Sequence, residues 1–250
     1  MLKIFHFLFL TGFHSLINER LRLKMMNFDE FFAVLDRSDD EFSISVKHSL
    51  DLIENIFNNY NINQISLSFN GGKDCTVIAY MINAVKHKLD LKQNLLSLYV
   101  KCQSPFDEVE EFVDESRQLF ELDLITQSKP LKLSLNEFLS INKDIKIIFI
   151  GTRSTDPNGK NLELISITDH DWPSILRVHP ILNWPYDFIW KFLLKFNIPY
   201  CSLYDKGYTS LGSTFNTHPN PNLKTNENEY KPAHQLELGS LERSGRFSIN

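Results

Sequence analysis

The sequence predicts an α/β fold: a doubly wound, mainly parallel sheet flanked by helices, followed by a loop-rich C-terminal region. Segments with the periodicity of strands and of helices alternate between residues 65 and 151. Residues 147–150 are all apolar, as in a strand buried on both faces of a parallel sheet. A glycine pair, Gly71 and Gly72, stands where the first predicted strand meets a helix, and open sheets of this kind bind ligands at such places.

Two helices are expected before the sheet begins, over residues 28–35 and 42–60. In the second of them, apolar side chains recur at helical spacing and form one face. Asp39 or Asp40 is expected to cap its first turn, because an aspartate oxygen can accept a hydrogen bond from a free backbone amide there. Both helices are interpreted as packing elements.

Strands and helices then alternate. The strands are expected over residues 65–69, 95–100, 122–126 and 146–151. The helices between them include residues 77–82, 106–120 and 133–141. Ser104 is predicted to cap the second of these helices, with Pro105 in its first turn and Asp107 completing the cap.

The C-terminal part is predicted to be mostly irregular. One amphipathic helix is expected over residues 185–196. The tail from Asn226 onward is polar enough to be disordered, except that Leu236 can begin a helix that runs to Arg243.

Composition excludes several classes of protein. Of the 250 residues, 42% are hydrophobic and 23% are charged, which is typical of one large globular domain. The net charge of −5 provides no broad basic surface for nucleic acid. Cys75, Cys102 and Cys201 are widely spaced, so they predict neither a zinc site nor a disulfide framework and indicate a reduced, intracellular compartment.

Residues 1–27 form an N-terminal extension of uncertain status. Its apolar run over residues 4–13 is too short to span a bilayer. The alternatives are a signal peptide, a mitochondrial presequence, and translation from Met25 or Met26, of which the last is preferred. We therefore expect a cytoplasmic protein, with mitochondrial targeting as the alternative. No later stretch is expected to span a membrane.

The strand, glycine pair and helix over residues 65–82 have the pattern of an anion site. Glycine lets the backbone pack close to a ligand, and the first amides of the helix are free donors at its positive end. The loop is not a Walker A motif, because Asp74 follows Gly72 and Lys73 where Ser or Thr is required. It is not a dinucleotide-binding G-x-G-x-x-G motif either. The alternative is a plain glycine turn before a helix.

Further ordered motifs extend this pattern over most of the chain. They occupy residues 69–75, 104–112, 151–157, 169–173, 177–184, 200–213, 216–223 and 242–246. With these motifs the sequence resembles the eukaryotic-type FAD synthases (FMN adenylyltransferases), a branch of the phosphoadenosine phosphosulfate (PAPS) reductase-like group of ATP pyrophosphate-loop enzymes. The similarity extends from about Phe42 to Arg246. Asn70 and Cys75 replace the two serines that flank the loop in the wider superfamily, and they fit this branch.

The resemblance implies an adenine nucleotide alpha hydrolase-like fold and one domain over residues 28–250, which includes the tail 224–250. It also implies transfer of AMP from ATP to FMN, which gives FAD and pyrophosphate. The FMN phosphate is already an anion at neutral pH, so it needs no strong general base to attack the α-phosphorus in line. Mg²⁺, amide donors and arginines are expected to neutralise the charge that builds on the leaving group.

The same resemblance assigns an ATP site at the glycine loop. Its residues are Ser68, Asn70, Gly71, Gly72, Lys73 and Asp74. Asp74 is expected to hold Mg²⁺ or to orient the loop amides, with a helix cap as the alternative. Lys73 is expected either to touch phosphate or to point to solvent.

The residues implied on the FMN side are Arg153, Asp156, Asp169, Trp172, Arg177 and Trp184. A carboxylate can accept a hydrogen bond from a flavin N–H or a ribityl hydroxyl, and an arginine can pair with phosphate. A tryptophan offers a flat apolar surface to the isoalloxazine ring. The respective alternatives are turn aspartates, structural ion pairs and core tryptophans.

Catalysis is assigned by the resemblance to Asn70, Asp74, Asp156, Arg243 and Arg246. The two arginines are three residues apart, so one helical turn would place both on the same side. The family implies that the tail folds over the active site and that both arginines reach phosphates.

Three other functions remain as alternatives. A PAPS reductase would need a reactive cysteine in the C-terminal region, where Cys201 is the last cysteine. A tRNA-modifying ATP pyrophosphatase is disfavoured by the acidic balance and by the absence of cysteine pairs. A nucleotide-binding module without catalysis is disfavoured by the intact loop and the arginine pair. The expected partners are ATP and FMN, without nucleic acid, and the chain is expected to be a monomer.

Overall fold

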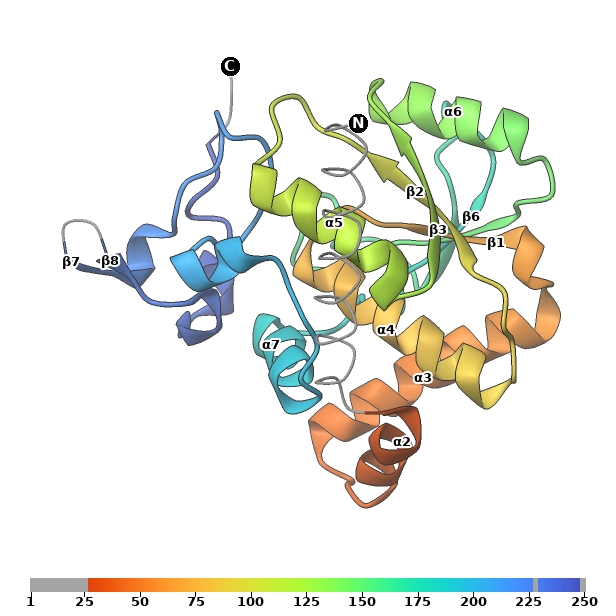
Figure 1. The fold of residues 1–250 in the computed structure, drawn as a ribbon, viewed down its shortest axis with the longest axis horizontal. Coiled ribbons are helices and arrows are strands. Elements are labelled where there is room, and N and C mark those ends of the chain that lie inside the picture. Colours follow the sequence, from red (N-terminus) through yellow and green to blue (C-terminus); the bar gives the residue numbers. More distant parts are fainter. Residues whose placement is uncertain (1–26, 227–228, 248–250) are drawn as a thin grey trace, which may run out of the picture.

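The computed structural model describes residues 27–226 and 229–247, with a six-stranded sheet at the centre (Figure 1). The strand order is β3–β2–β1–β4–β6–β5, in which β5 alone is antiparallel to its neighbour. The strands are β1 (Ile65–Ser68), β2 (Leu95–Val100), β3 (Leu122–Gln127), β4 (Ile147–Phe149), β5 (Ile165–Ile167) and β6 (Leu176–Val178). The predicted α/β fold with a mainly parallel sheet is confirmed. The predictions for residues 1–26 lie outside the described residues.

The strand order reverses at β1. From β1 the chain moves outward to β2 and β3, and it then returns to the other side of β1 to form β4. In the register of the sheet, Leu67 of β1 lies opposite Ser97 of β2 and Phe149 of β4. Ligands of open α/β sheets bind in the crevice beyond the carboxyl ends of the strands at such a reversal. The glycine loop follows β1 at this place.

Helices cover both faces of the sheet, because successive strand residues point to opposite sides. Ile147 and Phe149 of β4 belong to the larger core cluster, whereas Ile148 belongs to the smaller one. The larger cluster includes residues of α2 (Phe28–Asp36), α3 (Glu41–Asn59), α4 (Lys73–Lys88), α5 (Asp107–Leu119) and α7 (Tyr186–Lys195). The smaller cluster includes residues of α6 (Leu131–Ile141), which lies apart from the other helices in Figure 1.

One of the two predicted helix caps is present. Asp40 caps α3, because its Oδ1 accepts a hydrogen bond from Ser43 N at 2.7 Å. The predicted Ser104 cap is wrong: α5 begins at Asp107, and Ser104 has a left-handed φ of 53°. The Ser104 carbonyl instead accepts a hydrogen bond from Thr214 N at 2.9 Å. A contact with the C-terminal region therefore fixes the conformation of Ser104.

The C-terminal tail is held by tertiary contacts. The α-helix predicted from Leu236 to Arg243 is not formed, and two short 3₁₀ turns, Ala233–Gln235 and Gly239–Leu241, take its place. Thr217 and Arg246 form an isolated antiparallel bridge. The disorder that composition alone would allow is therefore absent from the described residues up to 247, and the tail packs on the rest of the domain, as the family resemblance implied.

Four short strands were not predicted. They are β5, β6 and the separate antiparallel pair β7 (Lys224–Asn226) and β8 (Glu229–Tyr230). Each has only two or three residues, and both apolar residues of β5 are exposed. A periodic pattern cannot be recognised over so few residues.

No helix within residues 27–226 and 229–247 combines the length and the apolar character that a membrane crossing requires.

Trp184 lies in the core of the domain. Its ring is 3% exposed and packs edge-on against Phe42, and its Nε1 donates to Ser49 Oγ at 3.0 Å. The Ser49 hydroxyl donates in turn to the Pro180 carbonyl at 2.7 Å. This chain of hydrogen bonds ties α3 to the segment between β6 and α7.

Replacing Ser49 by alanine removes the acceptor of one buried group and the donor of another. We expect Ser49→Ala to lower the free energy of unfolding by about 1–3 kcal/mol, measured by urea denaturation. The control is Ser140→Ala, whose exposed hydroxyl bonds only to the Glu137 carbonyl of its own helix. A loss in Ser49→Ala no larger than in this control would contradict the prediction.

Candidate active site

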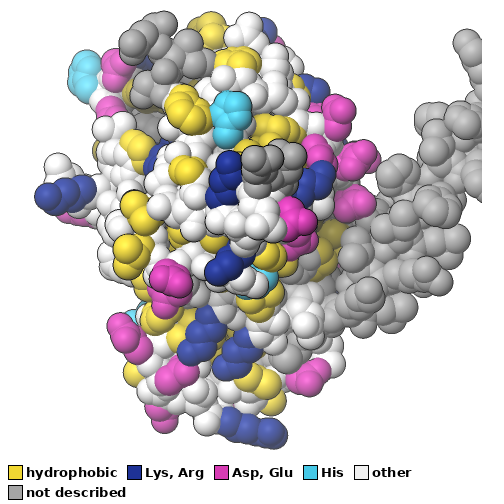
Figure 2. All heavy atoms as spheres, turned by 90° about the vertical axis from the view of Figure 1, so that its left-hand side faces the viewer, with side chains coloured by type: hydrophobic (Ala, Val, Ile, Leu, Met, Phe, Trp, Pro, Cys, Tyr) yellow, Lys and Arg dark blue, Asp and Glu magenta, His cyan; other side chains and the backbone are white. Residues whose placement is uncertain are grey.

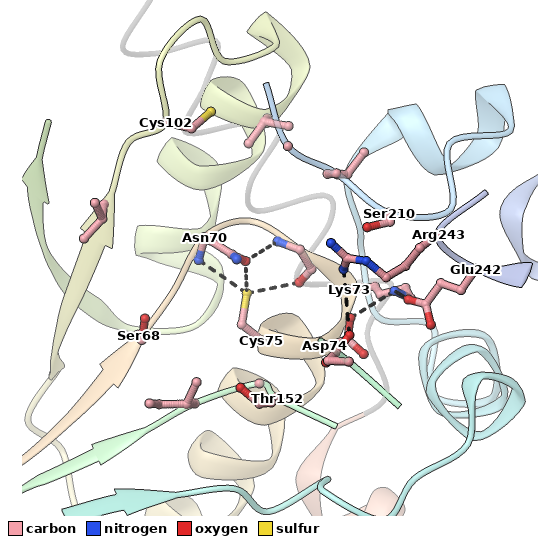
Figure 3. Close-up of a pocket in the computed structure, with 18 of the residues that line it drawn as sticks. Ser68, Asn70, Lys73, Asp74, Cys75, Cys102, Thr152, Ser210, Glu242 and Arg243 are labelled. Carbon is pink, nitrogen blue, oxygen red and sulfur yellow. Dashed lines mark hydrogen bonds and ion pairs between the residues drawn. The ribbon is translucent and has the colours of Figure 1, made fainter. Parts of the chain in front are cut away.

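A cavity of about 420 Å³ lies at the carboxyl ends of β1, β2 and β4, where the strand order reverses (Figure 3). Its walls come from the glycine loop, the end of β2, the segment after β4 and two parts of the C-terminal region. The site residues predicted from the sequence that line this cavity are Ser68, Asn70, Gly72, Lys73, Asp74, Asp156 and Arg243. Stretches that are far apart in the sequence thus converge on one space.

A second hollow, of about 840 Å³, lies at the opposite end of the strands, beside their amino ends. It is lined by residues that precede β1, β2 and β4, among them Asn61, Gln93 and Asn142. None of the site residues predicted from the sequence lines it. The chemistry is therefore sought in the cavity beside the glycine loop.

Asn70 organises the glycine loop. Its Oδ1 accepts hydrogen bonds from Gly72 N and from the Cys75 thiol, each at 2.9 Å (Figure 3). Because the oxygen is held by two donors, the amide nitrogen of Asn70 remains as a donor for a ligand. Gly71 has a φ of +71°, and a Cβ there would lie 2.8 Å from the Val113 side chain. The loop thus requires glycine at this position.

The segment after β4 crosses the first turn of α4 at close range. A Cβ on Gly151 would lie 3.0 Å from Cys75 N, so a glycine permits this approach. The crossing brings Thr152 and Asp156 to the wall of the cavity.

Burial raises the pKa of Cys75 to about 12, so its sulfur stays a protonated thiol at neutral pH.

Four charged side chains form a cluster at the cavity wall, which we call the charge cluster: Lys73, Asp74, Arg153 and Glu242. All of them except Arg153 line the cavity. Lys73 Nζ lies 2.9 Å from Asp74 Oδ2, and Arg153 Nε lies 2.8 Å from Asp74 Oδ1. Glu242 forms ion pairs with both Lys73 and Arg153. Two cations and two carboxylates therefore alternate, and they join α4, the segment after β4 and the tail.

Lys73 and Asp74 of the charge cluster stay charged at neutral pH. Burial alone would lower the pKa of Lys73, but attraction by Asp74 and Glu242 outweighs it and raises this pKa above its ordinary value. Burial alone would raise the pKa of Asp74, but Lys73 and Arg153 outweigh it and hold this pKa below its ordinary value. The charge cluster is therefore a set of mutually compensated buried ions.

The charge cluster changes the interpretation of two predicted ligand contacts. Lys73 was expected to touch phosphate or to point to solvent, but its side chain is buried between Asp74 and Glu242. Arg153 was expected to reach FMN, but it is fully buried and does not line the cavity. Both residues hold neighbouring side chains in place, which for Arg153 is the structural ion pair given above as the alternative.

The tentative metal role of Asp74 finds no support in the geometry. The Asp74 carboxylate lies between two cations, Lys73 and Arg153, which compete with any metal ion for its oxygens. Among the residues that the structure describes, no three His, Cys, Asp or Glu side chains form a group that could hold a metal ion. The chain therefore offers no metal cage of its own within this part, and a metal ion would need oxygens from a ligand.

Asp156 and Arg243 face each other across the cavity wall. The Asp156 carboxylate accepts a hydrogen bond from Arg153 N at 2.9 Å, and it lies 3.9 Å from Arg243 Nη1. The Arg243 side chain is 42% exposed, so much of its guanidinium is free to meet an anion. The tail thus places the cation of Arg243 at the cavity.

Arg246 lies beside the cavity and does not line it. Its Nη1 donates to the Leu211 carbonyl at 2.7 Å, and its guanidinium covers the Cα of Gly212, where a Cβ would lie 2.4 Å from Nη2. Burial, together with nearby Arg243, lowers the pKa of Arg246. The two arginines are therefore close, but only Arg243 reaches the cavity in this arrangement.

Three residues assigned to FMN lie on the turn between β5 and β6 and its flanks. Asp169 is largely exposed and lies 3.5 Å from Arg177 Nη2, which also donates to the Ile167 carbonyl. Trp172 packs on the smaller core cluster on the α6 side of the sheet. None of the three lines the cavity.

Trp184 was expected to contact the flavin ring, and its position argues against that role. A ring that is 3% exposed cannot stack on a ligand unless it leaves the core. The hydrogen bond to Ser49 satisfies its only polar atom. The alternative given above, a core tryptophan, describes it.

Sequence reasoning missed two residues that the fold brings to the cavity. Glu242 completes the charge cluster, and Tyr204 accepts a hydrogen bond from Lys73 N at 2.9 Å. Both lie inside ordered motifs, at 242–246 and 200–213, which was the available signal. Neither has a nearby sequence partner that would reveal its contacts.

Glu242→Gln should destabilise the fold, because it leaves two buried cations with one carboxylate. Loss of one partner of a buried ion pair costs about 3–5 kcal/mol, and the amide of Gln retains part of the hydrogen bonding, so we expect a loss near 3 kcal/mol in urea denaturation. The control is Glu237→Gln, an exposed change in the same tail that should alter stability by less than about 0.5 kcal/mol. Equal stability of the two variants would contradict the compensating role of Glu242.

Comparison with known proteins places this site in a family. The phosphoadenosine phosphosulfate reductase domain matches residues 127–219. A probable FAD synthase of Schizosaccharomyces pombe is 42% identical over 204 residues, which cover 79% of this chain and 77% of that protein. A probable FAD synthase of Caenorhabditis briggsae is 35% identical over 215 residues, which cover 84% of this chain and 41% of that protein.

Among solved structures, the FMN adenylyltransferase of Candida glabrata in complex with FMN and the ATP analogue AMPCPP has the same fold. The TM-score is 0.76 at 26% identity, over 84% of this chain and 92% of that one. The identity to the fission yeast protein extends over more than three quarters of both chains. This chain therefore belongs to the FAD synthase family.

Proposed function

We propose that this chain is an FMN adenylyltransferase, which transfers AMP from ATP to FMN and releases pyrophosphate. The observation that carries the proposal is the cavity at the strand reversal. There the glycine loop at the start of α4 faces Arg243 of the tail, in a chain that belongs to the FAD synthase family. A positive helix end and the partly exposed arginine at the same cavity suit a polyanionic ligand between them.

The proposed chemistry needs positioning more than acid–base catalysis. The FMN phosphate is already an anion, so it can attack the α-phosphorus while the bond to pyrophosphate breaks in line. Two polyanions repel each other, and the protein has to hold them close and stabilise the charge on the leaving group. Asn70, through its free amide nitrogen, and Arg243 are the proposed donors for phosphate oxygens.

We assign the ATP phosphates to Ser68, Asn70 and the backbone at Gly71 and Gly72. Lys73 and Asp74 act indirectly in this proposal, because the charge cluster occupies their side chains. Their role is to fix the first turn of α4, and with it the loop that holds the nucleotide.

The FMN side extends beyond the cavity. A space of about 420 Å³ suits one ligand of nucleotide size, so the second has to bind partly outside its walls. Asp156 is proposed to mark the junction, because it lines the cavity and its carboxylate is held by Arg153 N. Asp169, Trp172 and Arg177 are retained as FMN contacts on the family resemblance alone.

Mg²⁺ is proposed to enter as part of the ATP complex. This ion takes most of its ligands from phosphate oxygens and water, with one or two carboxylates from the protein. Both Asp74 and Asp156 line the cavity, but Asp156 fits such a role better, because no cation lies as close to it as Lys73 and Arg153 lie to Asp74.

The alternative of a PAPS reductase is weakened by the cysteines. That chemistry needs a reactive cysteine in the C-terminal region, where Cys201 is the last one. Burial raises the pKa of Cys201 to about 11, so this residue does not provide a thiolate at neutral pH. The alternative of a tRNA-modifying enzyme is weakened by surface charge. On the face formed by the C-terminal region, Lys and Arg side chains are interspersed with Asp and Glu (Figure 2).

Purified protein incubated with ATP, Mg²⁺ and FMN should produce FAD and pyrophosphate in equal amounts, measured by chromatography and a pyrophosphate assay. Omission of FMN should abolish pyrophosphate release. If ATP binds without turnover, the chain is an inactive binding module. If adenylyl sulfate is reduced and no FAD appears, the reductase alternative holds.

Arg243→Ala should lower kcat for FAD formation by about 100- to 1000-fold, because it removes a charged donor from the developing charge. The fold should survive, since this side chain is 42% exposed and its nearest carboxylate is 3.9 Å away. Thermal unfolding checks the fold, and Arg243→Lys, which keeps the charge, should lose less activity. Wild-type turnover in Arg243→Ala would refute its assignment.

A further inference from the structure

Tyr204 places a phenol hydroxyl against the glycine loop. The residue belongs to the 3₁₀ helix η2 (Ser202–Lys206), and its side chain is buried yet lines the cavity. Its hydroxyl oxygen accepts a hydrogen bond from Lys73 N, the first amide of α4, at 2.9 Å. The same oxygen would lie 3.7 Å from a Cβ built on Gly72, so it lies beside the loop backbone.

Among the described residues, no hydrogen bond is recorded in which the Tyr204 hydroxyl is the donor. A phenol accepts through oxygen and donates one hydrogen, and the bond from Lys73 N uses the accepting side. Within the part of the chain that the structure describes, the one hydrogen bond of this hydroxyl is the one it accepts from Lys73 N. The carboxylates of Asp74 and Glu242 pair instead with Lys73 and Arg153. Burial raises the pKa of Tyr204 above its ordinary value, so the hydrogen is present at neutral pH. A buried donor of this kind calls for an acceptor from outside the chain.

We propose that the Tyr204 hydroxyl donates a hydrogen bond to a phosphate oxygen of the bound nucleotide. The hydroxyl thereby links the first amide of α4 to the ligand. The relay runs from Lys73 N through the hydroxyl to the phosphate. Each donor in such a chain polarises the next, which strengthens the final bond. This inference rests on the proposed function for the identity of the nucleotide.

The surroundings specify an anionic acceptor. The positive end of α4 carries the hydroxyl, and Asn70 and Arg243 line the same cavity. The pyrophosphate part of ATP gains charge as it leaves, so a donor aimed at it binds more tightly in the transition state than in the ground state. We therefore assign Tyr204 to the pyrophosphate part, and it has no role on the FMN side.

The test is Tyr204→Phe, which keeps the ring and removes the hydroxyl. A hydrogen bond to a charged group predicts that the dissociation constant of pyrophosphate, titrated into the free enzyme by calorimetry, rises about 10- to 100-fold. For FAD formation, kcat/KM for ATP should fall by a similar factor, while KM for FMN should change less than about twofold. A packing defect would instead shift both substrates together.

The matched control is Tyr200→Phe. Tyr200 packs edge-on against Trp190, as Tyr204 does, but its hydroxyl donates to Asp205 Oδ1 at 3.1 Å and it does not line the cavity. It should leave pyrophosphate affinity and kcat/KM unchanged. Tyr204→Phe with pyrophosphate affinity within twofold of the wild type would overturn the inference.

A second measurement serves if Tyr204→Phe does not fold. In a crystal structure of the wild-type protein with AMPCPP, Tyr204 Oη should lie within about 3 Å of a phosphate oxygen. If no phosphate oxygen lies within hydrogen-bond distance of Tyr204 Oη, the inference is overturned. Pyrophosphate and AMPCPP binding are measured without FMN, so an enzyme that binds them through Tyr204 but makes no FAD would refute the proposed function and leave this inference standing.

Discussion

The charge cluster is the interaction on which the rest of the site depends. Lys73 and Asp74 begin α4, Arg153 follows β4, and Glu242 belongs to the tail. Taking each ion out of water is unfavourable by several kcal/mol, and mutual attraction offsets this only when every partner is in place. The charge cluster therefore fixes the glycine loop, the segment after β4 and the tail relative to one another. Loss of one charged partner weakens the attachment of all three. Backbone contacts at Gly151 and at the Thr217–Arg246 bridge support the same arrangement.

This arrangement separates the residues that hold the site from those that can meet a ligand. Lys73 and Arg153 have the chemistry of phosphate-binding residues, but the fold uses them as buried counterions. Glu242 anchors the tail at the cavity wall through its ion pairs, and the next residue, Arg243, also lines the cavity. Anchor and ligand-facing cation are neighbours in the sequence, so the docking of the tail and the charge at the cavity are linked. A polyanionic substrate would bind beside the charge cluster, in which two cations and two carboxylates already neutralise one another.

The fold and part of the site could be predicted from the sequence for physical reasons. The apolar run at 147–150 and the glycine pair at 71–72 are local signals, and the sheet and the loop followed from them. Ser104 could not be assigned, because its conformation is fixed by a contact with Thr214, more than a hundred residues away. For the same reason, Arg153 could not be distinguished from a ligand-binding arginine: its partners, Asp74 and Glu242, come from other parts of the chain. Aromatic character alone did not reveal that Trp184 bonds to Ser49 in the core.

A double-mutant cycle between Lys73 and Glu242 tests the account most directly, because these two residues join the glycine loop to the tail. The free energy of unfolding would be measured for Lys73→Met, Glu242→Gln, the double variant and the wild type. If the two side chains compensate each other in a buried cluster, the double variant should be more stable than the sum of the single losses predicts, by about 2 kcal/mol. Losses that add to within about 0.5 kcal/mol would mean that the tail is held by other contacts, and that the charge cluster does not organise the site.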